Sequence, residues 1–264
     1  MIAVIGAGKM GEALISGLLK AGTSPDDVLI TERYAARAQE LTQRYGVKAV
    51  SNAEAATAAE TLVLAVKPQD METLLTELSS VVTPDRLIVT IAAGIPTSAI
   101  EKRLVEGVPV VRVMPNTPAL VGEAMSAVAA GAHAQPRHLE RAEALFRPVG
   151  KVIRLPESQL DAVTALSGSG PAYIFYLVEA MTDAGILLGL PRSVAHDLIV
   201  QTVVGSAAML RDSGEHPVML REAVTSPAGT TIAAIRELEN HGVRAAFLAA
   251  LEAARDRSRE LAQQ

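Results

Sequence analysis

The sequence predicts an α/β protein in two parts: a doubly wound parallel sheet within residues 1–157, then an all-helical domain over residues 158–264. Two observations carry this prediction. In the first part, short β-branched apolar runs alternate with helical patterns, which is typical of strands covered by helices on both faces. After residue 154 only long helical patterns follow, with no convincing strand, so the boundary is expected near Pro156.

Apolar runs of strand length recur through the first part. The expected strands span residues 2–6, 28–31, 61–66, 87–91, 110–114, 126–129 and 151–154. Residues 12–20 carry apolar side chains at helical spacing and end before Gly22, and a second helix is expected over residues 35–45. Parallel sheets are covered on both faces, so their strands have nearly continuous apolar sequences. The strands expected here have such sequences, and the sheet is therefore predicted to be parallel.

Long helical patterns fill the second part. They span residues 172–188, 192–210, 230–239 and 243–261. Residues 172–181 are apolar nearly all round, and such a helix must be covered on every side. A small helical domain cannot bury it alone, so the sequence predicts at least a homodimer, formed by residues after about 158. Glu179 and Asp183 on this helix either serve a site or pair at that interface.

Composition excludes several classes of protein. The formal net charge of -5 argues against general nucleic-acid binding. The absence of Cys excludes disulfides, thiolate metal sites and Cys nucleophiles, and the five His show no metal-ligand spacing, so no metal is expected. The chain begins without a signal-peptide pattern, and no run reaches about 18 uncharged apolar residues. We therefore expect a cytoplasmic protein with no membrane contact.

A glycine-rich turn follows the first strand. Gly6, Gly8 and Gly11 match the pattern G-x-G-x-x-G, which is weak alone but here lies between a strand and a helix. In that context Gly6 permits a tight turn, Gly8 lets a pyrophosphate approach the helix start, and Gly11 permits close helix–strand packing. The pattern indicates a Rossmann-type dinucleotide site, and we include the intervening Lys9 and Met10 among the cofactor-binding residues.

Charged residues at the end of the second strand bear on the choice of cofactor. Glu32 lies where an acidic residue usually binds the ribose hydroxyl of NAD. Arg33 and Arg37 follow it, and either guanidinium could hold the 2′-phosphate of NADP instead. We expect NADPH to be preferred, because charge-assisted contacts to a phosphate outweigh one carboxylate that can turn to solvent.

Two loops follow strands at the edge of the sheet where ligands bind in open α/β folds. Residues 65–69 include Lys67 and Pro68, and residues 114–118 include Asn116, whose side chain offers both a donor and an acceptor. Each loop either contacts a ligand or is ordinary turn chemistry.

A run of small residues precedes a helix in the second part. Ser226, Gly229, Thr230 and Thr231 would place backbone N–H groups at a helix start, which suits an anion such as a substrate carboxylate. The alternative is an ordinary helix cap, for which Ser and Thr are favoured. Spacing alone does not separate the two.

Four motifs occur in order along the chain: residues 65–69 (AVKPQ), 114–118 (MPNTP), 166–173 (LSGSGPAY) and 220–232 (LREAVTSPAGTTI). Together they resemble the pyrroline-5-carboxylate reductase family. The resemblance implies reduction of the C=N bond of Δ1-pyrroline-5-carboxylate to L-proline, with NADPH, or NADH as the alternative. It also implies an active site like a slot between the two domains, dimers with interlocked helical domains, and further assembly, commonly into decamers.

The resemblance also assigns site residues. Those matching cofactor contacts are Gly6, Gly8, Gly11, Asn52, Ala65, Lys67 and Pro68, with Asn116 nearby. Those matching the substrate loop are Ser226, Gly229, Thr230 and Thr231. In the family the loop backbone holds the carboxylate and the threonine at the position of Thr231 bonds the ring nitrogen, so Thr231 is the expected catalytic residue.

One departure concerns this loop, because many family members have glycine where this chain has Ala228. If that position needs a positive φ, alanine is strained by about 1 kcal/mol or more. Alternative functions are another Rossmann-type imine dehydrogenase, a β-hydroxyacid dehydrogenase, or a non-catalytic NADPH-binding sensor. A β-hydroxyacid dehydrogenase needs a catalytic lysine in its second domain, but the last lysine here is Lys151.

Overall fold

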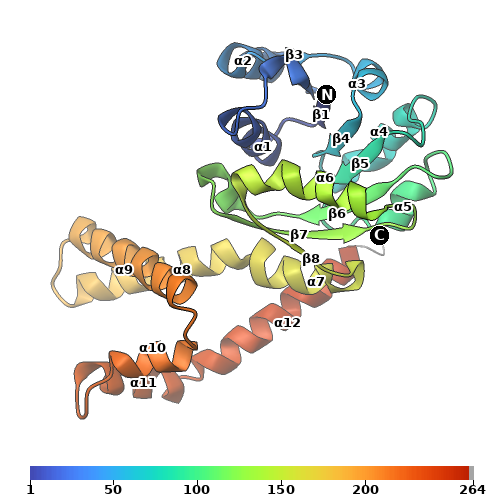
Figure 1. The fold of residues 1–264 in the computed structure, drawn as a ribbon. Helices are drawn as coiled ribbons and strands as arrows, with labels where there is room; N and C mark the ends of the chain where they lie inside the picture. Colours follow the sequence, from blue (N-terminus) through green and yellow to red (C-terminus); the bar gives the residue numbers. More distant parts are fainter. Residues whose placement is uncertain (262–264) are drawn as a thin grey trace. The chain divides into compact units, whose positions relative to one another are not determined.

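The computed structural model describes residues 1–261 and forms two compact units (Figure 1). The first comprises Met1–Ser169 and the segment from Ala254 onward, and the second comprises Gly170–Ala253. The expected domain limits of 1–157 and 158–264 remain a prediction. The compact units divide later in the sequence, because Leu160 is fully buried against the sheet residues Ala127 and Ala129.

An eight-stranded sheet forms the centre of the first unit, in the order β3-β2-β1-β4-β5-β6-β7-β8. Its strands are β1 (Ile2–Ile5), β2 (Val28–Thr31), β3 (Lys48–Ala49), β4 (Thr61–Leu64), β5 (Leu87–Thr90), β6 (Val110–Met114), β7 (Ala124–Ala130) and β8 (Gly150–Arg154). The strands from β1 to β6 run parallel, whereas β7 runs antiparallel to β6 and β8 runs parallel to β7. The predicted strands are all present, and the sequence pattern missed the two-residue strand β3.

The prediction of an all-parallel sheet is wrong for β7 and β8. Only the short helix η3 (Thr117–Val121) lies between β6 and β7. A parallel return needs a crossover of about a dozen residues or more, usually a helix, so this short connection forces β7 to run back along β6.

Helices cover both faces of the sheet. In the first unit they are α1 (Lys9–Lys20), α2 (Ala35–Tyr45), α3 (Asn52–Ala58), α4 (Met71–Leu78), α5 (Thr97–Glu101), α6 (Pro136–Phe146) and α7 (Leu160–Val163). Short 3-10 turns are η1 (Pro25–Asp27), η2 (Pro68–Asp70), η4 (Arg147–Val149) and η5 (Glu157–Gln159), and residues Thr164–Gly168 form a π-helical turn. Helix α2 has the predicted bounds, while α1 begins three residues earlier than predicted.

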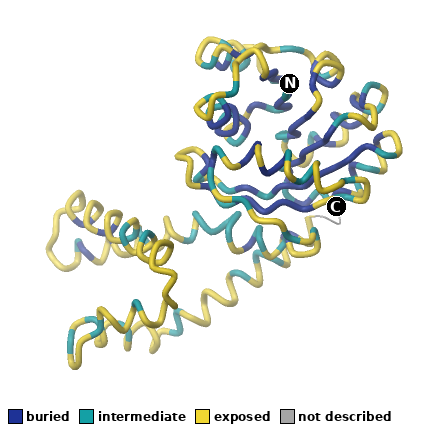
Figure 2. The backbone as a smooth tube through the Cα atoms, viewed as in Figure 1, coloured by how far each residue is buried: buried dark blue, intermediate teal, exposed yellow. Residues whose placement is uncertain are grey.

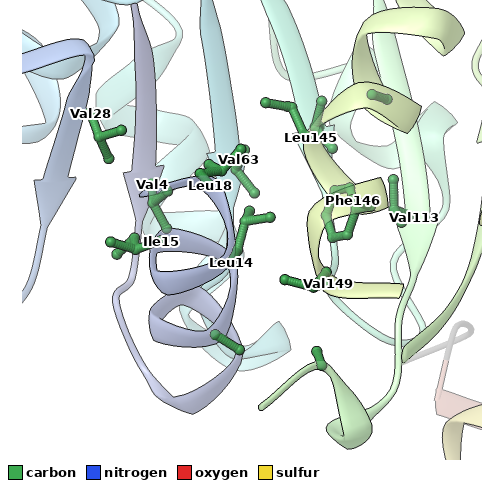
Figure 3. Close-up of a cluster of buried hydrophobic side chains, with 14 of the residues drawn as sticks. Val4, Leu14, Ile15, Leu18, Val28, Val63, Val113, Leu145, Phe146 and Val149 are labelled. Atoms are coloured by element: carbon green, nitrogen blue, oxygen red, sulfur yellow. The ribbon is translucent and has the colours of Figure 1, made fainter. Parts of the chain in front are cut away.

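The core of the first unit follows the alternation of side chains along the strands. On one face Leu14 and Leu18 of α1 pack with Val4, Val63 and Phe146 (Figure 3). The opposite face carries Ile5, Leu62 and Leu64 from the same strands against α3, α4 and α5. All these side chains are buried, so the unit has a core of its own.

The second unit consists of helices and the loops that connect them. It contains α8 (Gly170–Leu187), α9 (Arg192–Ser213), α10 (Pro217–Ala223), α11 (Thr230–Asn240) and most of α12 (Val243–Leu261). The four long helices confirm the predicted ones to within three residues at each end. Most of their apolar side chains are exposed within the chain. Exposed residues, drawn yellow in Figure 2, make up most of these helices.

Helix α9 differs from the expectation that no segment could span a membrane. By length and composition alone it could cross a bilayer, with a mean hydropathy of 1.3 over its most apolar window and 11% of that window buried inside the chain. Buried core helices of other proteins pass the same test. In the single chain, many apolar side chains of α9 and of the neighbouring α8 are exposed.

The end of α12 returns to the first unit. The Ser258 hydroxyl donates to the Asp161 carboxylate at 2.7 Å, and Ser258 is almost fully buried. Residues 254–261 therefore complete the unit that contains the sheet.

Candidate functional site

The three glycines of the first turn each meet a different geometric demand. Gly6 has a φ of 88°, and a Cβ there would lie 2.9 Å from the Val66 backbone nitrogen. A Cβ on Gly11 would lie 2.7 Å from the carbonyl oxygen of Gly6, so only glycine lets α1 pack this closely. A Cβ on Gly8 would meet nothing within 4 Å. The turn therefore leaves open space above Gly8, where the predicted pyrophosphate would approach.

The start of α1 is open to an anion. Gly8 is the N-cap residue and supplies no side-chain cap, so the first N–H groups of Lys9, Met10 and Gly11 have no side-chain acceptor there. Gly8 and Lys9 are exposed. The helix dipole adds a partial positive charge at the same point.

The parallel strands bring most predicted cofactor residues to one edge. The Gly6 N–H donates to Thr31 at the end of β2, and the Ala65 N–H donates to Ile5 at the end of β1. Strand order reverses between β1 and β4, which is where open α/β sheets bind ligands. Residues at the carboxyl ends of these strands and of β3 and β6 include Gly6, Glu32, Asn52, Ala65, Lys67, Pro68 and Asn116.

The charged residues after β2 are unequally engaged. The Glu32 carboxylate accepts the Tyr34 N–H at 3.1 Å, so it is bound to the main chain two residues further on. Arg33 is 76% exposed and lies 3.8 Å from Asp70. Arg37, in contrast, is bound by the carboxylates of Glu12 and Glu40. Of the two arginines proposed for a 2′-phosphate, only Arg33 keeps an exposed guanidinium.

Glu12 is the centre of the cluster that holds Arg37. Its carboxylate also accepts from Arg44 and from the Tyr45 hydroxyl, both at 2.9 Å. Burial raises the pKa of Glu12, but hydrogen bonds from Arg37 and Tyr45 outweigh burial and leave the pKa below its ordinary value. The cluster ties α2 to α1 and keeps Glu12 charged.

The remaining residues of this edge divide by exposure. Lys67 and Pro68 are exposed, and Lys67 precedes η2. The Asn52 side chain donates to Glu77 of α4 at 2.7 Å. Asn116 has both polar atoms of its amide on protein partners: it donates to the Ser167 carbonyl at 3.1 Å and accepts the Met125 N–H at 2.9 Å.

The predicted substrate loop forms a reverse turn before α11. The Gly229 N–H donates to the Ser226 carbonyl at 3.1 Å, and Pro227 occupies the second position of the turn. Gly229 is the N-cap of α11 and supplies no side-chain cap, so the ordinary Ser or Thr cap is not what these residues form. The helix start is left open to an anion.

Ala228 has a φ of 54°, so this position does adopt a positive φ. It is the one non-glycine residue with positive φ among residues 1–261. A turn with Pro at its second position commonly needs such a φ at the third, where glycine is usual. Alanine adopts it at a cost of about 1 kcal/mol.

The Thr231 hydroxyl differs from other helical threonines of this chain. Those that donate to the carbonyl four residues earlier are Thr57, Thr76, Thr164, Thr182 and Thr202. Thr231 is the second residue of α11, so no earlier helical turn offers it a carbonyl, and its hydroxyl forms no hydrogen bond within residues 1–261. Its hydroxyl is left for another partner.

One acidic residue of α8 has an ionic partner within the second unit. Asp183 forms an ion pair with Arg192 at 3.1 Å, with both side chains more than half exposed. Within the described part of the chain no group of three or more His, Cys, Asp or Glu could hold a metal ion.

Sequence reasoning missed a partly buried ionic cluster in the first unit. Glu157 accepts from the Thr97 N–H at 2.8 Å and from the Thr97 hydroxyl at 2.7 Å, so it caps α5, whose own N-cap is a proline. The same carboxylate lies 3.3 Å from Arg112, a residue only 5% exposed on β6. The partners are far apart in sequence, and no local pattern signals them.

Comparison with known proteins covers the full chain. Residues 157–261 match the family profile described as pyrroline-5-carboxylate reductase dimerisation, and residues 1–94 match NADP oxidoreductase, coenzyme F420-dependent. A pyrroline-5-carboxylate reductase from Corynebacterium melassecola is 47% identical over 264 residues, covering 98% of each chain.

Solved structures agree over the same length. A pyrroline-5-carboxylate reductase from Coxiella burnetii has a TM-score of 0.94 and 37% identity, covering 100% of this chain and 98% of that one. A Plasmodium falciparum pyrroline carboxylate reductase with NADP bound has a TM-score of 0.89 and 27% identity, covering 99% and 97%. The similarity extends through both units.

Proposed function

The chain belongs to the pyrroline-5-carboxylate reductase family, and we propose that two of its open helix starts, at Gly8 and at Gly229, carry the family's reaction. The protein is an NAD(P)H-dependent oxidoreductase that reduces the C=N bond of Δ1-pyrroline-5-carboxylate to L-proline, the final step of proline biosynthesis. The observation that carries the site assignment is that neither helix start is capped by a side chain, so each has backbone donors for an anion.

The edge of the sheet fits a dinucleotide. Open space above Gly8 admits a pyrophosphate, and the residues that would hold the cofactor are Gly6, Gly8, Lys9, Met10, Gly11, Glu32, Arg33, Asn52, Ala65, Lys67 and Pro68. When bound, the nicotinamide supplies the hydride, while the protein supplies position and electrostatics.

The loop before α11 fits the substrate. Backbone N–H groups after Gly229 would hold the carboxylate, with Ser226 and Thr230 beside it. Thr231, whose hydroxyl is not spent inside its helix, would orient the imine nitrogen and pass a proton to it through water. A protonated imine is already electrophilic, so a strong protein acid is not required.

We propose NADPH as the preferred cofactor because Arg33 presents an exposed guanidinium beside β2. Arg33→Ala should lower kcat/KM for NADPH about tenfold and leave the value for NADH nearly unchanged, the size of one charge-assisted contact. Arg37→Ala should leave the ratio unchanged, since Glu12 and Glu40 hold that guanidinium. An unaltered ratio in Arg33→Ala would exclude Arg33 as the 2′-phosphate contact.

We propose that the self-association indicated by the dimerisation region is an obligate homodimer formed after residue 158, with a decamer as the larger assembly that the family resemblance implies. The exposed apolar side chains of α8 and α9 support the dimer, since obligate interfaces resemble a domain core cut in half. A cytoplasmic location stays a prediction from the sequence.

The direct test follows loss of NAD(P)H absorbance with pyrroline-5-carboxylate as substrate, alongside NADPH binding by fluorescence. Turnover with this substrate is expected. Tight NADPH binding without turnover would instead favour a non-catalytic sensor. The β-hydroxyacid dehydrogenase alternative is disfavoured by the absence of lysine after residue 151.

A further inference from the structure

Asn116 joins three segments of the first unit. It lies directly after β6, its amide oxygen accepts the N–H of Met125 on β7, and its amide nitrogen donates to the carbonyl of Ser167. Only one orientation of the amide satisfies both contacts, because one partner is a donor and the other an acceptor. Ser167 is 51 residues away in the sequence.

The side chain does not serve its own turn. Asn116 is the N-cap residue of η3, a position where asparagine usually bonds the N–H groups that follow it, yet no such bond forms. Local turn chemistry therefore does not account for an asparagine at this position, and the distant contacts do.

The segment that Asn116 holds is a π-helical turn, Thr164–Gly168. Such turns are rare and occur frequently at functional sites. The turn lies against the same loop at a second point, where a Cβ on Gly168 would come within 2.6 Å of the end of the Met114 side chain. The buried Ser167 hydroxyl has no hydrogen-bond partner among residues 1–261, so the main chain of the turn, through the Ser167 carbonyl, makes the polar contact with the loop.

We propose that Asn116 is a positioning residue, which fastens the π-helical turn to the loop after β6 and thereby fixes one wall of the reaction site. Dinucleotides extend across the carboxyl edge of such sheets from one nucleotide-binding half to the other. The glycine turn follows β1 and belongs to the first half. The loop after β6 borders the second half, where the nicotinamide is expected. This inference rests on the proposed function and replaces direct cofactor contact as the role of Asn116.

The two roles make different predictions. A residue that touches the cofactor contributes to its affinity, whereas a positioning residue mainly affects the rate of the chemical step. Displacing a reacting group by about 1 Å can lower the rate about 100-fold. If Asn116 fastens the π-helical turn, this turn should open more often when Asn116 is replaced, whether or not cofactor is bound.

The main test uses Asn116→Asp, which keeps the side-chain volume and the acceptor for Met125 but cannot donate to Ser167. We expect kcat to fall 10- to 100-fold, with the NADPH dissociation constant, measured without substrate, within about threefold of wild type. In the cofactor-free protein, hydrogen exchange of the Ser169 amide, which closes the π turn on the Thr164 carbonyl, should quicken about tenfold or more. Asn116→Ala, which loses both contacts, should show the same pattern.

The control is Thr76→Val in α4, outside this turn. It removes the bond from the Thr76 hydroxyl to the Glu72 carbonyl but leaves the contact of Asn116 with Ser167. Its kcat should stay within about twofold of wild type, the level of a lost local contact. This control separates fastening from general loss of stability.

Each other outcome overturns the inference. A dissociation constant that rises in step with the loss of kcat/KM, with exchange unchanged, would make Asn116 a cofactor contact. Faster exchange with normal kcat would mean that the contact between Asn116 and Ser167 is purely structural. A wild-type protein without reductase activity would refute the proposed function, while exchange at Ser169 would still decide whether Asn116 fastens the turn.

Discussion

The two compact units cover the apolar side chains of their helices to different extents. In the first unit Leu14 of α1 is 1% exposed, because strands and other helices of the same chain cover it. In the second unit Phe175 of α8 is 67% exposed and Leu187 is 89% exposed. The contrast teaches that apolar periodicity predicts that a side chain will be buried, but not whether its own chain or another copy buries it.

The largest effect should follow from a charge on the exposed face of α8. Phe175→Asp would bury a carboxylate in the proposed dimer interface. The free-energy cost of burying that charge exceeds the stabilisation that the interface gains at this position. We expect light scattering to show no dimer at micromolar concentration, and activity to fall below detection.

The matched control is Val105→Asp in the first unit. Val105 is also exposed, at 49%, but lies outside the dimerisation helices. Its stability and assembly should change by less than about 0.5 kcal/mol. If both variants behaved alike, the distinction between the units would fail.

The next largest effect should come from Thr231→Val, which keeps the shape of the side chain and removes its hydroxyl. If the hydroxyl bonds the reacting nitrogen, kcat should fall roughly 10- to 1,000-fold. NADPH affinity should barely change, because the proposed cofactor residues lie in the other unit. A structural role would instead lower the melting temperature with turnover within threefold of wild type, and that result would refute the assignment.

A stability measurement compares ion pairs of the two units. Glu157→Ala removes the cap of α5 and leaves the buried Arg112 without its carboxylate, so the free energy of unfolding should fall by about 2–3 kcal/mol. Glu237→Ala breaks an ion pair with Arg236, where both side chains are more than half exposed, and should cost less than about 0.5 kcal/mol. Urea unfolding distinguishes them, and equal losses would mean that burial of Arg112 does not matter.

The smallest effect concerns the substrate loop. Ala228→Gly relieves the positive φ but adds freedom to the unfolded chain, so a net gain of about 0.5 kcal/mol is expected. Ala36→Gly, in the exposed first turn of α2, should lose about 1 kcal/mol instead. Thermal unfolding of both variants shows whether each one gains or loses stability. A loss of stability in Ala228→Gly would show that the loop is not strained.

Much of the fold could be predicted from local patterns. The strands, the long helices and the demand for glycine at Gly11 depend on neighbours within a few residues or on alternation along one strand, whereas the close contact at Gly6 is with the distant Val66. The direction of β7 could have been predicted as well, because the short link after β6 leaves no room for a crossover.

The engagement of individual side chains could not be predicted in the same way. Arg37 reads as a phosphate contact in the sequence, yet Glu12 binds it from 25 residues away. Asn116 reads as a turn residue or a ligand contact, yet its partner is Ser167. Such pairs depend on how elements pack, and a single sequence carries no local signal for them.

The contact between Ser258 and Asp161 has a consequence for synthesis of the protein. The two residues are separated by 97 positions. At about 5–20 residues per second on the ribosome, Asp161 waits roughly 5–20 s for its partner. During that interval α8 and α9 have already been made, with their apolar faces uncovered. The unit that contains the sheet is thus the first to begin folding and among the last to be completed, and the dimerisation helices must be kept from aggregating until then.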